Sequence, residues 1–177
     1  MAELCLGWEA NMIILGIDPG LAIVGWGVIE YSGSHFRTLG YGSIQTPAGM
    51  PTEQRLSEIY DSLEKLIETY HPDEIAVEEL FFNTNQTTGI RVAEARGVII
   101  MCAFRHGVKV FEYTPLQVKQ AVVGYGRAEK KQVITMVTMF LGLSAPPKPD
   151  DTADALAIAV CHAHSGSSRL AQYYNQK

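Results

Sequence analysis

Short apolar runs alternate with longer amphipathic stretches along this chain, and the spacing of the apolar positions separates predicted strands from predicted helices. The predicted strands are residues 13–18, 24–31, 36–46, 74–79 and 109–113. The predicted helices are residues 52–70, 86–105, a short helix beginning at Pro115, 129–141 and 151–164. This mixture places the chain in the α/β class.

The order of these elements predicts the topology of the sheet. The turn Ser32-Gly33-Ser34 joins the second and third strands, so these two strands are expected to pair antiparallel. The two later strands are each reached through a helix, which predicts parallel pairing. We expect one domain over residues 12–164, built as a five-stranded mixed sheet with helices on both faces. Residues 1–11 are expected to be an N-terminal extension, and residues 165–177 a flexible tail.

Acidic residues stand at the ends of two predicted buried strands. Asp18 ends the run Ile13–Ile17, and Glu78 and Glu79 follow Ile75-Ala76-Val77. Acidic side chains are almost never fully buried unless they have a partner. Taken alone, Asp18 also fits an Asp-Pro-Gly turn, and the glutamates fit a solvated strand end. Because side chains alternate across a strand, one glutamate faces each side, and periodicity does not decide which of them is functional.

Two more acids, Asp151 and Asp154, stand just before the Ala-rich run of the last predicted helix. Their i, i+3 spacing puts both side chains on one helix face. Capping of the helix N-terminus is the alternative explanation for such acids. Asp154 lies past the cap position, where capping explains it less well.

Together these acids predict a metal site. Adjacent strands lie ~4.8 Å apart, so two acid-ended strands and a covering helix can bring their carboxylates together. Two charges ~4 Å apart repel by ~4 kcal/mol at an effective dielectric constant of ~20, and cations would relieve this repulsion. No His or Cys lies within these motifs, and an all-oxygen set suits hard divalent cations. Two such ions can assist a phosphoryl displacement without a protein nucleophile.

The distribution of charge adds a polyanion as a candidate partner. The 177 residues have a formal net charge of −5, yet residues 1–90 carry 3 basic and 13 acidic residues, and residues 91–148 carry 9 basic and 3 acidic residues. Such asymmetry favours a polyanion, although solvated helix faces explain it equally well. The three cysteines lack metal-site spacing and fit reduced thiols in a cytoplasmic protein. No apolar run approaches the length of a membrane-spanning helix, so no membrane partner is expected.

Six motifs occur in a fixed order between residues 12 and 164. They are Gly16-Ile17-Asp18-Pro19-Gly20, Val77-Glu78-Glu79-Leu80-Phe81, Ala93-Glu94-Ala95-Arg96-Gly97, Gln117-Val118-Lys119-Gln120, Ala128-Glu129-Lys130 and Asp154-Ala155-Leu156-Ala157-Ile158-Ala159. Together they resemble the bacterial RuvC family of Holliday junction resolvases. The resemblance implies an RNase H-like fold and a homodimer that makes paired symmetric nicks in four-way junction DNA during recombination and repair. It also implies branch-migration proteins as partners.

The resemblance further implies a set of metal ligands. By motif, four acids match the family's catalytic, metal-binding set, namely Asp18, Glu78, Asp151 and Asp154. It selects Glu78 over Glu79, because Phe81 follows at the family's spacing. We expect this set to hold two Mg²⁺ ions per subunit, with Mn²⁺ able to substitute, and the products to carry 5′-phosphate and 3′-hydroxyl ends.

Several residues are expected to contact DNA. Phe81 resembles the family's aromatic residue that inserts at the junction, and ordinary core packing is its alternative role. Lys119 and Lys130 match family lysines near the scissile phosphate, where they can hold backbone oxygens. The weaker candidates for phosphate contact, for which a solvated surface position is the likelier role of each alone, are Arg91, Arg96, Arg127 and Lys131.

The predicted helix 86–105 is apolar on more than one face, which a helix covered only by its own sheet does not need. Part of it is therefore expected to form the dimer contact, as the resemblance also implies. His162 and His164 end the last predicted helix, where cations suit the helix dipole, and they are not assigned to metal.

Two other functions remain open. A nucleotide binder of the actin or sugar-kinase type also uses an Asp-x-Gly turn after its first strand, but it needs two such domains, and 177 residues are too few. A non-catalytic junction-binding module with a degenerate site is the second alternative, and the intact set of acids argues against it.

Overall fold

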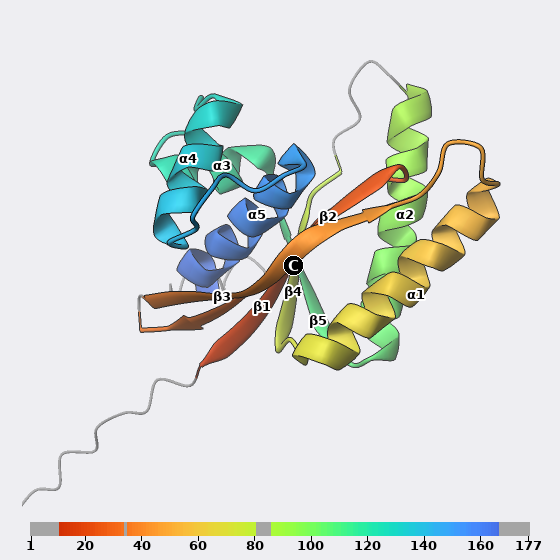
Figure 1. The fold of residues 1–177 in the computed structure, drawn as a ribbon, viewed down its shortest axis with the longest axis horizontal. Helices are drawn as coiled ribbons and strands as arrows, with labels where there is room; N and C mark the ends of the chain where they lie inside the picture. Colours follow the sequence, from red (N-terminus) through yellow and green to blue (C-terminus); the bar gives the residue numbers. More distant parts are fainter. Residues whose placement is uncertain (1–10, 34, 81–85, 167–177) are drawn as a thin grey trace, which may run out of the picture.

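A single mixed sheet of five strands forms the centre of the protein. The structure is a computed structural model that describes residues 11–33, 35–80 and 86–166. Its strands are β1 (Met12–Asp18), β2 (Ile23–Ser32), β3 (His35–Gln45), β4 (Glu74–Glu78) and β5 (Lys109–Tyr113). They lie in the order β3-β2-β1-β4-β5 (Figure 1). The pairs β1–β2 and β2–β3 are antiparallel, whereas β1–β4 and β4–β5 are parallel. This confirms the predicted topology.

Helices cover both faces of this sheet. They are α1 (Thr52–Tyr70), α2 (Gln86–Arg105), α3 (Pro115–Val123), α4 (Lys130–Phe140) and α5 (Asp150–Gly166). α1 and α2 lie on one face, and α3, α4 and α5 lie on the other (Figure 1). Successive side chains of β1 point to opposite faces of the sheet. Ile14 packs in the core under α5, whereas Leu15 and Ile17 pack in the core under α1 and α2.

The element boundaries differ little from those expected. α5 begins one residue earlier than predicted and continues to Gly166, two residues beyond the predicted end of the domain. α4 begins at Lys130, because the side chain of Gln132 accepts a hydrogen bond from the Glu129 N–H and closes the helix start there. The predicted extension and tail fall almost wholly outside the described residues, so the proposed domain limits stay a prediction.

At two glycine positions α5 lies directly against the backbone of the sheet. A Cβ placed on Gly16 of β1 would stand 2.1 Å from the carbonyl oxygen of Ala155, and one on Gly25 of β2 would stand 2.0 Å from that of Asp151. α5 contributes small residues to the same contact, including Ala159. This glycine–alanine seam brings the first turn of α5 directly onto the carboxyl end of β1.

Gly16→Ala is therefore expected to destabilise the protein by about 1–3 kcal/mol, because the new methyl group forces α5 away from β1. The matched control is Gly49→Ala, since a Cβ at Gly49 meets nothing within 4 Å. Urea unfolding followed by circular dichroism measures both variants. Equal unfolding midpoints for the two variants would contradict the close contact.

His162 lies in a buried polar network and does not cap a solvated helix end as expected. It is 1% exposed, and its Nε2 lies 2.6 Å from Glu74 Oε2 while its Nδ1 lies 2.7 Å from the Tyr113 hydroxyl. Burial lowers the pKa of His162 despite the nearby Glu74 carboxylate. A neutral ring satisfies both contacts when Nε2–H donates to Glu74 and the Tyr113 hydroxyl donates to Nδ1. The network thus ties α5 to β4 and β5.

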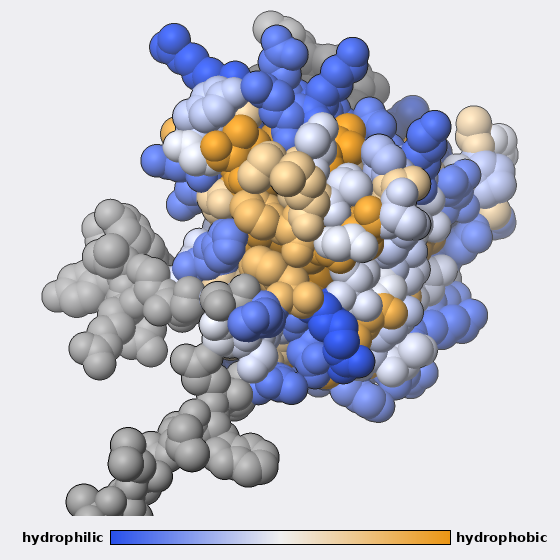
Figure 2. Space-filling model, turned by 60° about the vertical axis from the view of Figure 1, so that its left-hand side comes forward, coloured by the Kyte–Doolittle hydropathy of each residue, from blue (hydrophilic) through white to orange (hydrophobic). Residues whose placement is uncertain are grey.

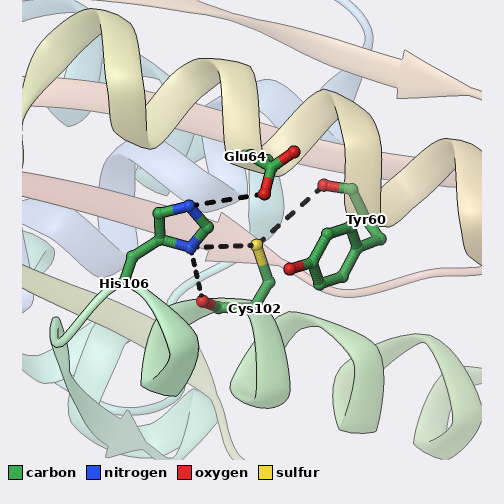
Figure 3. A network of polar contacts seen from close by, with 4 residues as sticks. All are labelled: Tyr60, Glu64, Cys102 and His106. Atoms are coloured by element: carbon green, nitrogen blue, oxygen red, sulfur yellow. Dashed lines mark hydrogen bonds and ion pairs between the residues drawn. The ribbon is translucent and has the colours of Figure 1, made fainter.

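A second polar network joins α1 to α2 (Figure 3). The His106 ring lies with Nδ1 2.9 Å from the Cys102 carbonyl oxygen and Nε2 3.4 Å from Glu64 Oε1. The Cys102 thiol is buried, and its sulfur lies 3.9 Å from the Tyr60 carbonyl oxygen. Burial, and then the nearby Glu64 carboxylate, raise the pKa of this thiol to about 11. Cys102 therefore stays a neutral thiol, as expected for a packed, unreactive cysteine.

An apolar band crosses the side of the molecule that lies at the left of Figure 1, where α3 and α4 are drawn (Figure 2). The large apolar side chains that α3 and α4 leave exposed are Leu116, Met139 and Phe140. None of these three lines the pocket of the functional site. Among the described helices, none is both long and apolar enough to cross a membrane.

Candidate functional site

Three elements bring the four predicted acids to one edge of the sheet. β1 and β4 are parallel neighbours with Ile17 opposite Val77, so Asp18 and Glu78 follow at the adjacent carboxyl ends. Gly25 is the β2 partner of Asp18, and the Asp151 carbonyl lies against it. The first turn of α5 therefore lies over the end of β1 and brings its two acids there.

A side-chain contact holds the start of α5 in this place. Thr152 is fully buried, and its hydroxyl donates a hydrogen bond of 3.0 Å to the Gly42 carbonyl of β3. Its N–H donates to the Pro149 carbonyl, which closes the first turn. The sequence of α5 thus alternates the acids that face the site with the small and hydroxyl side chains that face the sheet.

The electrostatics show that the four carboxylates act on one another. Burial, followed by the charges of Asp154, Glu78 and Asp151, raises the pKa of Asp18 to about 8, and only Lys130 acts in the opposite direction. Burial and Asp154 raise the pKa of Glu78, although Lys119 and Lys130 lower it. Shifts of this kind are characteristic of functional sites, where like charges are held close together in a partly buried place.

Lys130 supplies the positive charge nearest to these acids. Its Nζ lies 2.8 Å from Asp154 Oδ2 and 3.7 Å from Asp150 Oδ2. Burial raises the pKa of Asp154 by more than the hydrogen bond to Lys130 lowers it. Burial alone would lower the pKa of Lys130, but its pairing with Asp154 outweighs that effect and the net direction is upward. The sequence predicted a DNA contact for Lys130 and missed this pairing, which joins residues 24 positions apart.

Glu78, Asp154, Lys119 and Lys130 line one pocket of about 180 Å³. Its remaining walls are Pro115, Val118, Val133, Ala157 and Ile158. The pocket therefore combines two acids and two lysines with an apolar lining, which lowers the local dielectric constant and strengthens each charge interaction.

Helix caps position the two lysines. α3, which carries Lys119, begins with a capping box in which the Thr114 hydroxyl accepts from the Gln117 N–H and the Gln117 side chain accepts from the Thr114 N–H. The spacing Thr-Pro-x-Gln signals such a helix start, and could have located it from the sequence alone. Lys130 occupies the first position of α4.

The carboxylates approach one another without forming a finished ligand cage. Within residues 11–33, 35–80 and 86–166, no three His, Cys, Asp or Glu side chains stand in metal-binding geometry. The repulsion among the acids and the contact of Lys130 with Asp154 account for this spacing physically. The donor set still fits a hard divalent cation, because it is all carboxylate; burial first, and then the neighbouring acids, raise the pKa of Asp18, and a cation would favour its ionised form.

The remaining predicted DNA contacts are distributed more widely. Arg91 is exposed and shares with Asp151 a groove of about 450 Å³. Arg96 is mostly buried and forms an ion pair between α2 and β5, with Glu112. Two further candidates, Arg127 and Lys131, are exposed on either side of the start of α4. Phe81 lies outside the described residues, so its role stays a prediction.

Known proteins resemble this chain over nearly its whole length. A family model described as crossover junction endodeoxyribonuclease RuvC matches residues 14–162. A relative of that name from Alkaliphilus metalliredigens is 61% identical over 155 residues, which cover 88% of this chain and 94% of the relative. One from Clostridioides difficile is 58% identical, covering 87% of this chain and 91% of the relative.

Solved structures agree. The structure of Thermus thermophilus RuvC in complex with Holliday junction substrate has a TM-score of 0.82 and 38% identity, covering 86% of this chain and 93% of that one. The yeast mitochondrial Holliday junction resolvase Ydc2, at 13% identity and a TM-score of 0.64, shares the fold alone. The RNase H-like architecture, the ordered motifs and these matches agree, and the chain belongs to the RuvC family of crossover junction endodeoxyribonucleases.

Proposed function

We propose that this protein cuts four-way DNA junctions by paired, metal-dependent nicks. The observation that carries the proposal is the pocket in which Glu78 and Asp154 meet Lys119 and Lys130, together with the half-buried Asp18 carboxylate whose pKa responds to these acids. Membership of the RuvC family supports the junction as substrate, and a related structure contains one. The family also decides against the nucleotide-binding alternative.

The acids are proposed to hold two Mg²⁺ ions, with Mn²⁺ able to substitute. The expected ligands are Asp18, Glu78, Asp151 and Asp154. When bound, such a pair of ions would activate a water molecule for attack on phosphorus and stabilise the leaving oxygen. The protein side chains then have the tasks of binding, orientation and charge compensation.

Lys119 and Lys130 are proposed to bind the non-bridging oxygens of the scissile phosphate. Both lysines line the pocket that Glu78 and Asp154 share, whose other walls are apolar. Negative charge grows on the phosphate oxygens during the displacement, so fixed positive charges there favour the transition state. Lys130 also holds Asp154 in place through its 2.8 Å contact.

The decisive experiment is cleavage of a synthetic four-way junction, with a linear duplex of the same sequence as control. We expect symmetric nicks in the junction with Mg²⁺ or Mn²⁺, none with EDTA, and little cleavage of the duplex. Tight binding of the junction without nicking under any of these metals would favour the non-catalytic module instead.

We also propose a homodimer formed through α2. The helix buries Ala95, Ile99, Cys102 and Ala103 against its own core but leaves Ile90 56%, Met101 49% and Phe104 81% exposed. Their spacing, together with Gly97, follows one stripe along the helix. A Cβ at Gly97 would meet nothing within 4 Å, so a partner helix can approach closely there. A two-fold dimer presents two equivalent sites to a two-fold junction.

Phe104→Glu is expected to convert the dimer to a monomer, because it places a charge at the most exposed position of the apolar stripe. Sedimentation equilibrium measures the mass. The matched control, Met139→Glu on α4, changes a side chain that is 69% exposed on the other side of the sheet and should leave the dimer intact. A dimeric Phe104→Glu protein would contradict the interface. Branch-migration proteins stay a predicted partner.

A further inference from the structure

Arg55 is a buried cation that has no carboxylate partner among the described residues. It lies in the first turns of α1 and is only 6% exposed. Its Nε donates to the Thr46 hydroxyl at 2.7 Å, and its Nη2 donates to the Thr46 carbonyl at 3.4 Å. A guanidinium group has five N–H donors, and the described residues accept from two of them; the nitrogen without an acceptor there, Nη1, is not sealed from solvent. No acid of the described segments lies within ion-pair distance of it.

Burial of an unpaired charge is costly, and the mostly buried Arg96, by comparison, contacts Glu112. Arg55 alone among the described buried residues keeps a formal positive charge with only neutral partners. Such a group is expected to bind an anion that comes from outside the chain.

A groove gives such an anion access to Arg55. It has a volume of about 450 Å³ and is lined in part by Arg55, by the turn Gly20–Ile23 and by Arg91 of α2. Arg91 is exposed and adds a second guanidinium to the same groove. Asp151 also lines the groove, so the groove and the candidate metal ligands share a wall.

Arg55 is held rigidly with respect to the turn that follows Asp18. The Thr46 hydroxyl that accepts from Arg55 donates in turn to the Leu21 carbonyl at 2.6 Å. The Thr46 N–H donates to the Ala22 carbonyl at 3.0 Å. The guanidinium is therefore oriented before any ligand arrives, which reduces the entropy lost on binding.

We propose that Arg55 and Arg91 together bind a backbone phosphate of the DNA strand that flanks the scissile phosphate. The planar fork of a guanidinium group matches the oxygens of a phosphodiester, and two such groups in one groove suit a single phosphate. The groove does not need to recognise a base. Its task is to set the register of the strand over the acids, so Arg55 and Arg91 act as positioning residues. This inference rests on the proposed cleavage of junctions.

A charge-neutralisation scan tests the proposal. Junctions are made with one uncharged methylphosphonate at successive phosphates around the cleavage site, and binding is measured in EDTA. For the wild-type protein, we expect about a tenfold loss of affinity at one flanking position. Arg55→Gln and Arg91→Gln should bind the unmodified junction about tenfold more weakly and should lose nothing further at that position. Each variant should also reduce the slope of log affinity against log salt concentration by about 0.9.

The control is Arg37→Gln, an exposed arginine of β3 that pairs with Glu30. It should keep the wild-type profile. Should Arg55→Gln fail to fold in a thermal melt, the exposed Arg91→Gln variant decides alone. The proposal is overturned if the wild-type profile persists in the variants or the salt slope is unchanged. Failure of the wild-type protein to bind any junction would instead count against the proposed function.

Discussion

Asp18→Asn is expected to slow junction cleavage by about 100-fold or more while junction binding persists. Asn keeps the size of the side chain but removes a half-buried carboxyl group that can ionise to bind a cation, and whose pKa responds to the other three acids. Loss of that ligand weakens the proposed cation site, whereas the lysines and arginines proposed to bind DNA are untouched. Single-turnover cleavage rates and binding in EDTA separate the two effects. Wild-type cleavage by Asp18→Asn would remove Asp18 from the site.

Neighbouring glutamates offer a matched control for this result. Glu78→Gln should cause a loss comparable to that of Asp18→Asn, because Glu78 lines the pocket with Asp154. Glu79→Gln should cleave at nearly the wild-type rate, since Glu79 is exposed. Equal losses for the two glutamate variants would indicate a general effect of charge at the end of β4, and not a specific ligand.

The metal-free protein is expected to lose stability as the pH rises from about 4 to about 8. Asp18 keeps its proton in the folded protein up to a pKa of about 8, whereas the unfolded chain releases it near 3.8. Between these values folding takes up a proton, so a higher pH disfavours the folded state, and the loss levels off above pH 8. Each pKa unit corresponds to about 1.4 kcal/mol, so the change is large for a domain of this size.

Thermal melts in EDTA between pH 5 and pH 9 measure this effect. Glu78 and Asp154 have pKa values raised in the same direction, so the wild-type slope contains their contributions too. Asp18→Asn isolates the contribution of Asp18 and should flatten the profile. Mg²⁺ added at pH 8 should raise the melting temperature of the wild-type protein more than that of the variant. Parallel profiles for the two proteins would contradict the burial of Asp18.

The fold was predictable because its information is local. Apolar runs, a two-residue period in the strands and the breaks at Gly and Pro located every element to within a few residues. The alternation of side chains between the two faces of the sheet was predictable as well, since adjacent residues of a strand point to opposite faces. The acids at the ends of β1 and β4 were visible for the same reason, as polar interruptions of apolar runs.

The pairings within the site were not predictable, because they join residues far apart in the chain. Lys130 and Asp154 meet only after α4 packs on α5, and no local period records that contact. Likewise, the bond between His162 and Glu74 spans 88 positions and became apparent only in the folded structure. Arg55 is similar, since an arginine in an amphipathic helix normally lies in solvent.

The choice between Glu78 and Glu79 shows what a local sequence pattern can predict and what it cannot. Alternation along β4 established that the two side chains diverge but gave no sign of which one points toward Asp18. The parallel register of β1 and β4 indicates which one does. Ile17 lies opposite Val77, so the next residues along the two strands, Asp18 and Glu78, are neighbours. The local pattern therefore left the choice open, the family resemblance made it, and the pairing of strands more than fifty residues apart agrees with it.

The seam between α5 and the sheet also limits how this enzyme can be re-engineered. Where side chains separate a helix from a sheet, replacing a leucine by a valine moves the helix by a fraction of an ångström. The functional side chains on that helix move with it. At Gly16 and Gly25 there is no such adjustable spacer, because backbone meets backbone. Attempts to alter the preferred ion or the cutting rate by core redesign should therefore fail, and libraries are better directed at the acids themselves or at the connector that leads into Asp150.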